Sequence, residues 1–133
     1  MRKLVKCKNF VTADQTASKE TDLVLDLNGP LPVNLRFDLV IWSGVLEYIN
    51  YPEEIFSWIK IVSRGFVGSY AHIESIAMSG NEAATRSANG WRNHLTLVEL
   101  SRMAMASGFL MKFHESWRNQ SIFSGVLALP SRT

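Results

Sequence analysis

The sequence contains a single cysteine, Cys7, among its 133 residues. One thiol excludes an internal disulfide and a metal site built from several cysteines, and it is typical of a protein in a reducing cytoplasm. The chain also lacks any apolar run of the roughly 20 residues that a membrane-spanning helix needs, and it carries no signal-peptide pattern. We therefore expect a cytoplasmic location and no membrane partner.

A strong net charge is absent as well. The formal net charge is +2, which is too mild to imply a nucleic-acid partner. Apolar residues interrupt the basic cluster at the start of the chain, which consists of Arg2, Lys3, Lys6 and Lys8. We favour a solvated strand face or terminus for this cluster over an anion or nucleic-acid contact. The histidines lack the spacing of metal ligands, so we predict no metal site; they are His72, His94 and His114.

What is present is the composition of a globular domain. The chain is 47% hydrophobic and 20% charged, unlike a disordered protein. A chain of this length can bury a sizeable core. We expect one domain over residues 1–133.

Apolar runs predict the main strands of a sheet, at 37–42, 65–70, 109–117 and 121–128. The first run is nearly unbroken, which suits a parallel strand covered on both faces. We therefore expect Val40 to be buried from both sides of the sheet. The last two strands are joined by a short turn and predict an antiparallel pair.

Weaker signals lie near the start of the chain and in its middle. Two short strands are predicted at 9–13 and 22–28, separated by a polar segment over 15–21 that is a loop or a short turn of helix. The small and polar residues of 76–90 predict a long loop or mobile cover, with room for a helical turn.

Two helices are predicted near 52–63 and 96–107. Pro52 suits a first helical turn, where its missing N–H costs nothing. Thr96 and Glu99 have the spacing of a capping box, and Gly108 is a typical C-terminal stop. Strands that alternate with helices indicate an α/β fold with a mostly parallel sheet, to which the last hairpin adds an antiparallel edge.

These segments, in this order, resemble the Rossmann-like S-adenosylmethionine-dependent methyltransferases. The resemblance covers about residues 9–128. It rests on "DLVLDLNGPLPVNLRFDLVIWSGVLEYI", on the helix after Pro52, on "GFVGSYA", and on "GWRNHLTLVELSRMAMASGF" followed by two strands. It implies S-adenosylmethionine as cofactor and a small molecule as substrate.

The resemblance also implies cofactor contacts. Asp26 and Leu27 match the pair beside the adenine, and Asp14 matches the acidic residue that holds the ribose hydroxyls. The end of the strand in "FDLVIWSGVLEYI" matches the part that faces the methionine moiety, where Ser43 and Gly44 leave room for a ligand. Asp14 and Asp26 each have an alternative interpretation as the cap of a local turn. For Ser43 and Gly44, the alternative is the ordinary turn that any strand end needs.

Three residues are candidates for catalysis: Glu47, Tyr70 and His94. Glu47 is expected on the rim of the site, as a general base or a substrate-orienting group. Its alternative is a salt bridge or a hydrogen bond to the backbone. Tyr70, His72 and Glu74 follow a strand on the expected ligand side, and they are otherwise ordinary loop residues.

The resemblance places "GW-x-NH" near the active site. The residues concerned are Trp91 and His94. If the resemblance is set aside, the alternative interpretation is that Trp91 is a packing residue and that His94 is a loop residue with local hydrogen bonds.

The sequence departs from the family at the start. No G-x-G pattern occurs near the N-terminus, so the family's glycine-rich loop, first strand and first helix have no counterpart, and we expect a sheet truncated at this end. Two functions remain open, a small methyltransferase and a non-catalytic binding or assembly domain derived from one; the missing loop favours the second.

A truncated sheet would expose the edge of the strand 37–42. Proteins rarely leave such an edge open. We expect a homodimer with residues 4–13 and 37–48 at or near the contact. The alternative is that the segment 9–13 fills the vacant place in the sheet.

Overall fold

The structure is a computed structural model that describes residues 6–74, 80–117 and 120–129. Arg2, Lys3, the first two residues of the expected contact 4–13, and residues 76–79 of the expected loop lie outside these ranges. The chain divides into two compact units, Met1–Leu31 and Pro32–Thr133, which we describe separately. The expectation of a single domain stays a prediction.

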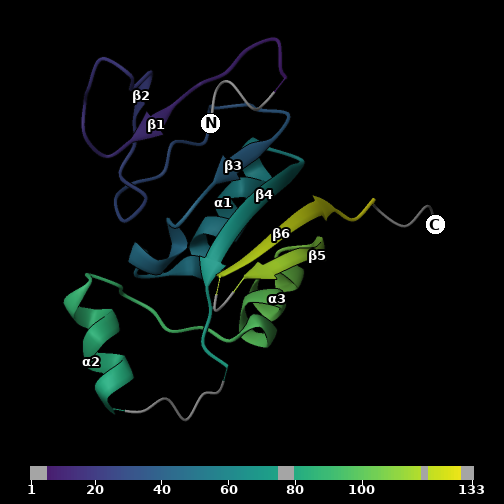
Figure 1. Ribbon diagram of the computed structural model, residues 1–133. Coiled ribbons are helices and arrows are strands. Elements are labelled where there is room, and N and C mark those ends of the chain that lie inside the picture. The colour runs from purple at the N-terminus through teal and green to yellow at the C-terminus, as the bar shows by residue number, and fades with distance from the viewer. Residues whose placement is uncertain (1–5, 75–79, 118–119, 130–133) are drawn as a thin grey trace. The chain divides into compact units, whose positions relative to one another are not determined.

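The first unit contains two very short strands, β1 (Ala13–Asp14) and β2 (Leu23–Val24), which pair in parallel (Figure 1). They are shorter than the predicted strands, and beside the pair a side chain also bonds the backbone. The Asp22 carboxylate accepts from the Thr12 N–H at 2.8 Å and from the Thr12 hydroxyl at 2.9 Å.

The second unit contains a four-stranded sheet in the order β3-β4-β6-β5. Its strands are β3 (Val40–Trp42), β4 (Gly65–Ala71), β5 (Phe109–Trp117) and β6 (Gln120–Leu127). β3 and β4 are parallel, whereas β6 lies between β4 and β5 and is antiparallel to both. The predicted α/β class and the antiparallel C-terminal hairpin are confirmed.

The core is built around the Phe66 ring. This ring contacts four other aromatic rings, those of Trp42, Phe56, Phe109 and Phe123. Two glycines make room for them: a Cβ at Gly68 would lie 2.3 Å from Trp42 Cε2, and a Cβ at Gly125 would lie 2.4 Å from Phe66 Cζ. The helices α1 (Pro52–Val62) and α3 (Leu97–Ala106) cover this side of the sheet.

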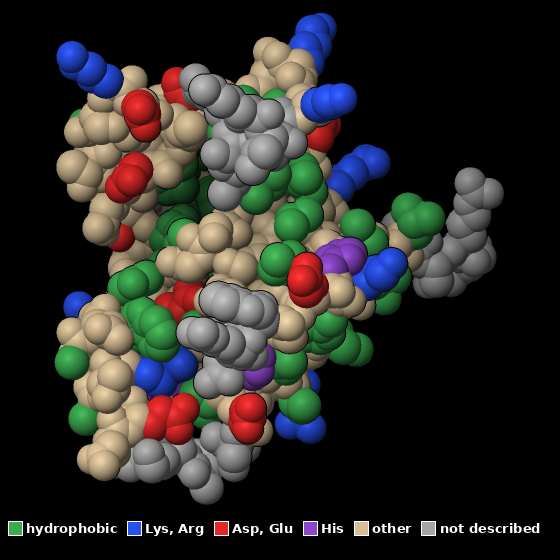
Figure 2. All heavy atoms as spheres, in the orientation of Figure 1, with side chains coloured by type: hydrophobic (Ala, Val, Ile, Leu, Met, Phe, Trp, Pro, Cys, Tyr) green, Lys and Arg blue, Asp and Glu red, His purple; other side chains and the backbone are tan. Residues whose placement is uncertain are grey.

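The other side of the sheet carries exposed apolar side chains. Leu110 and Val126 are paired across β5 and β6 and are 60% and 58% exposed. A Cβ at Gly65 would lie 3.6 Å from Val126 Cγ1 and 3.8 Å from Leu39 Cδ1, so these residues flank Gly65 on the same face. Figure 2 shows hydrophobic side chains gathered over the strands on this side. We call the set Leu39, Leu110, Ile122 and Val126 the open face.

The environment of β3 corrects one prediction. Val40 is half-buried, not buried, and Leu39 is exposed. The strand has three residues, with Phe37 joined to Ser63 by an isolated bridge. β3 pairs with β4 on one side, and no described strand of its unit lies on the other side. Because helices cover only one face here, an unbroken apolar run does not ensure burial on both faces.

The two predicted helices are confirmed. α1 begins at Pro52, and α3 has the predicted capping box: the Glu99 N–H donates to Thr96 Oγ1 at 3.2 Å, and Glu99 Oε2 accepts from the Thr96 N–H at 2.8 Å. Gly108 follows with a φ of +92°. No helix in the described parts of the chain combines the length and apolarity needed to span a membrane.

A third helix, α2 (Gly80–Ala88), occupies most of the stretch that the sequence predicted to be a loop. The chain turns away from the helix at Gly90, where φ is +80°. The Trp91 N–H donates to the Arg86 carbonyl at 3.1 Å and the Gly90 N–H to the Ser87 carbonyl at 2.9 Å, which is the hydrogen-bond pattern of a Schellman motif. The loop prediction was wrong because α2 has no apolar stripe; the residue that it buries is a cation, Arg86.

Removing the α3 cap is expected to destabilise the second unit by about 1 kcal/mol. In Thr96→Ala, the Glu99 N–H loses its acceptor, and the melting temperature is expected to fall by a few degrees. Thr96→Ser keeps the hydroxyl and serves as the control. Equal melting temperatures for Thr96→Ala and wild type would contradict a stabilising role for this cap.

Candidate functional site

The candidate site lies where β3 and β4 end at the same edge of the sheet. After β3 the chain turns at Ser43 and Gly44, with a φ of +59° at Gly44. The Gly44 N–H donates to Ser69 Oγ at 3.1 Å, and the Ser69 hydroxyl donates to Ser43 Oγ at 3.4 Å. Apart from the chain neighbours of Gly44, no atom of the described residues lies within 4 Å of the position that a Cβ of residue 44 would take. The turn therefore presents hydroxyls and open space at the carboxyl ends of two parallel strands, the common position of ligands in α/β sheets.

Glu47 lies in the 3-10 helix η1 (Leu46–Tyr48) directly after this turn. Its prediction as a rim residue was wrong, since it is only 2% exposed. Glu47 Oε1 accepts a hydrogen bond from the Ala71 N–H at 2.7 Å, whereas Oε2 has no partner among the described residues. Burial raises the pKa of Glu47, against the opposing effects of backbone hydrogen bonds and of the positive charge of Arg86. The geometry is that of the backbone-bonding alternative.

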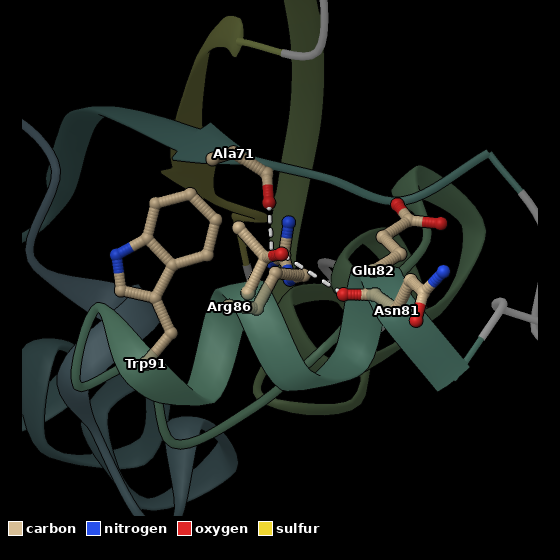
Figure 3. Close-up of a pocket in the computed structure, with 6 residues that line it drawn as sticks. Ala71, Asn81, Glu82, Arg86 and Trp91 are labelled. Atoms are coloured by element: carbon tan, nitrogen blue, oxygen red, sulfur yellow. Dashed lines mark hydrogen bonds between the residues drawn. The ribbon is translucent and has the colours of Figure 1, made fainter.

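Arg86 of α2 binds the carbonyl of Ala71, the residue whose N–H donates to Glu47. It is 5% exposed, and its Nη2 donates to the Ala71 carbonyl at 2.8 Å (Figure 3). The guanidinium carbon lies 4.3 Å from the centroid of the Trp91 ring, a cation–π contact. The Trp91 indole N–H in turn donates to the Tyr48 hydroxyl at 3.2 Å.

The same arginine fixes the protonation of His94. Arg86 Nε donates to His94 Nδ1 at 2.9 Å, so the neutral imidazole carries its proton on Nε2. Burial, followed by the positive charge of Arg86, lowers the pKa of His94. The lowered pKa favours the neutral form of His94, and in this tautomer its Nε2 carries the proton and is not available to accept one.

Tyr70 is fully buried and holds a loop. Its hydroxyl donates to Asn93 Oδ1 at 2.5 Å and accepts from the Leu95 N–H at 2.9 Å. Burial raises the pKa of Tyr70 to about 12, so its phenol stays protonated. The Asn93 amide also donates to the carbonyls of Leu46 and Ile49, at 2.6 and 2.8 Å. These bonds join the segment after α2 to the one after β3.

His72 and Glu74, the two other residues that the sequence singled out after β4, have different environments in the structure. His72 is buried, with Nδ1 3.2 Å from the Ser121 hydroxyl oxygen. Burial lowers the pKa of His72, although the carboxylate of Glu74 opposes this. Glu74 is exposed.

The three remaining predicted cofactor residues belong to the first unit. Asp14 Oδ1 accepts from the Thr16 N–H at 3.1 Å, and Asp26 Oδ1 accepts from the Asn28 N–H at 2.9 Å. These are the local turn contacts of the alternative interpretation. Leu27 is half-buried. The predicted contacts of the three with a cofactor stay predictions.

A pocket of about 350 Å³ lies beside Arg86 (Figure 3). Its lining residues are Ala71, Asn81, Glu82, Thr85, Arg86 and Trp91. The sequence had singled out only Trp91 among them. Glu82 and Arg86 have the i, i+4 spacing of a helical pair, a signal that could have identified α2 and its pocket.

Comparison with known proteins finds matches among solved structures. Neither a protein-family profile nor a curated protein matches the chain. Solved structures do match: the N-terminal domain of EvdMO1 with SAH bound superposes with a TM-score of 0.62 at 18% identity. Human N-acetylserotonin methyltransferase in complex with SAM gives 0.59 at 14%. Magnesium protoporphyrin IX methyltransferase from Synechocystis PCC 6803 with bound SAH gives 0.53 at 17%.

The chain has a methyltransferase fold. The matches cover 83%, 86% and 78% of this chain in the order given, but 55%, 36% and 49% of the matched chains. The chain thus spans about half the length of these structures or less. The resemblance seen in the sequence is confirmed at the level of the fold, and the candidate site lies at the carboxyl ends of the parallel strands β3 and β4.

Glu47→Gln is expected to remove a pH dependence of stability. Because burial raises the pKa of Glu47, the folded protein holds this proton more tightly than the unfolded chain. The resulting stabilisation is fully present below the ordinary Glu value of 4.5 and is lost as the pH rises through the raised pKa. Relative to Glu47→Gln, the wild type should lose unfolding free energy over this range in urea titrations. Glu53→Gln, at an exposed position of α1, is the control; parallel curves for wild type and Glu47→Gln would refute the shift.

Proposed function

We propose that the chain binds S-adenosylmethionine at the carboxyl ends of β3 and β4 and takes part in methyl transfer to a small molecule in the cytoplasm. The open turn at Ser43 and Gly44 carries this proposal. The backbone there has a conformation that favours glycine, and the place of the missing Cβ is open. The likeness to solved structures that contain SAM or SAH supports it.

The donor groups at the turn fit the methionine part of this cofactor. Ser43 and Ser69 provide hydroxyls, and Gly44 allows close approach of the backbone. The contacts of Asp14 with the ribose hydroxyls, and of Asp26 and Leu27 with the adenine, stay predictions from the resemblance. The bound cofactor supplies an electrophilic methyl group, and the protein has to align an acceptor with it.

The candidate acid–base groups favour alignment over proton abstraction. Glu47 and Tyr70 are buried and accept hydrogen bonds from backbone N–H groups, and His94 has a donor at Nε2. The same observation also favours a second function, a non-catalytic binding or assembly domain, since none of the three is set up as a base. A measurement of S-adenosylmethionine binding distinguishes the proposed function from a function that does not use this cofactor.

Gly44→Ala is expected to weaken S-adenosylmethionine binding at least about tenfold, roughly 1.4 kcal/mol, because the new methyl group enters the open space at the turn. Titration calorimetry at high protein concentration measures this. Gly108→Ala places a side chain at another positive φ, far along the chain in the turn after α3, and should leave the affinity unchanged. A wild type that shows no heat and no competition by S-adenosylhomocysteine would remove the enzyme function.

We also propose a homodimer in which the open face packs against a second copy. The face is apolar, and exposed apolar patches of this kind mark interfaces. The register places Lys112 and Glu115 on the same side, opposite Ser124 and Ile122. A twofold axis can therefore bring unlike charges together around the apolar centre.

Leu110→Glu is expected to convert the dimer into a monomer, because it places a carboxylate on the open face. Light scattering at micromolar concentration should give about twice the 15.0 kDa of one chain for the wild type. Met105→Glu, which changes an equally exposed residue of α3, should leave the mass unchanged. A wild type of one chain mass would refute the dimer.

A further inference from the structure

The pocket beside Arg86 has walls that no part of the proposed cofactor site uses. Its volume of about 350 Å³ is at the low end of the range of ligand pockets, so it suits a ligand of one or two small rings. In Figure 3, Trp91 lies on one side of Arg86, while Asn81 and Glu82 lie on the other. A ligand here meets an aromatic ring, a carboxylate and neutral polar groups.

The charges of the walls select against charged ligands. Arg86 contributes a buried positive charge, and Glu82 contributes a carboxylate. An anion that approaches the guanidinium also meets Glu82, and a cation that approaches Glu82 also meets Arg86. Because the two side chains carry opposite charges, each one offsets the attraction of the other for a charged ligand, and a neutral ligand is favoured.

The polar walls offer both donors and acceptors. The Asn81 amide can donate and accept, and the Glu82 carboxylate accepts. The Thr85 hydroxyl donates to the Asn81 carbonyl at 2.9 Å and keeps lone pairs that accept. Across Arg86 from them lies the Trp91 indole, whose N–H is engaged by Tyr48. The Arg86 guanidinium lies over this ring, and the part of the indole that lines the pocket adds an apolar surface.

We propose that this pocket binds a neutral sugar or a similar polyhydroxylated ring. A sugar ring has a C–H face, which suits the Trp91 indole, and hydroxyls at its edge, which suit Asn81, Glu82 and Thr85. Both properties follow from the chemistry of the walls.

The pocket also lies at the same edge of the sheet as the Ser43–Gly44 turn. Its wall residue Ala71 ends β4, two residues after Ser69, which accepts from the Gly44 N–H. As the methyl acceptor, a role that rests on the proposed function, a sugar oxygen forms the bond to the methyl carbon while the carbon–sulfur bond breaks. The electron pair of that bond stays on sulfur, and the hydroxyl proton leaves to water.

The test compares three sugars that differ in charge: D-glucose, D-glucosamine and D-glucuronate. Saturation-transfer NMR and calorimetry on the full chain should show binding of D-glucose, with at least about tenfold weaker binding of both charged sugars. Equal binding of the three, or binding of none, would overturn the proposal.

Variants assign the site. Trp91→Ala is expected to abolish D-glucose binding, with circular dichroism as the check that α2 is intact. Asn81→Ala, at an exposed helical position, is the second variant and should weaken binding severalfold. Ser87→Ala changes an exposed residue of α2 outside the pocket and should have no effect. Equal affinities of Asn81→Ala and Ser87→Ala would overturn the assignment.

Cofactor titration keeps this proposal separate from the proposed function. Asn81→Ala should bind S-adenosylmethionine like the wild type, because Asn81 is not part of the Ser43–Gly44 turn. Sugar binding in a protein that binds no S-adenosylmethionine would support the pocket and contradict the methyl transfer. Cofactor binding without sugar binding would contradict the sugar pocket and support the methyl transfer.

Discussion

Two buried side chains, the carboxyl of Glu47 and the guanidinium of Arg86, hold the residue that ends β4. The Glu47 carboxylate accepts from the Ala71 N–H, and the Arg86 guanidinium donates to the Ala71 carbonyl. A buried charge costs several kcal/mol unless hydrogen bonds and an opposite charge compensate it, so Glu47 and Arg86 depend on this shared residue. Through it, the turn after β3, the end of β4 and α2 become one structure. The stack on Trp91, the tautomer of His94 and the pocket beside α2 all depend on the same arrangement.

This arrangement separates the residues that shape the site from those that face a ligand. Glu47 and Tyr70 have the chemistry of acids and bases, but both are used to fix the backbone. Ser43 and Gly44 have little chemistry of their own, yet they are exposed at the carboxyl end of β3, the edge at which α/β sheets commonly bind ligands. If the proposed methyl transfer takes place there, rigid supports without a free base suit it, because alignment contributes most to such a displacement.

Local signals predicted most of the second unit. Pro52 and the pair Thr96 and Glu99 marked both long helices, because a helix start is decided by residues within one turn. Val40 failed as a core position, since the second face of a strand is buried only if another element covers it. For the site, the sequence predicted the Ser43–Gly44 turn, and the fold of the neighbouring solved structures agrees with the resemblance that suggested it.

By itself, the sequence determined the order of the four sheet strands and of α1 and α3, the cap of α3 and the turn at Gly44, because each depends on the conformational preferences of neighbouring residues. Only the tertiary structure decided what α2 does. Arg86 lies 15 residues from Ala71 and 8 from His94, and no local pattern says that a cation in a polar helix is buried against both. Its burial became favourable when the chain brought a carbonyl, an imidazole nitrogen and an indole ring to one place, which is a property of packing and not of sequence spacing.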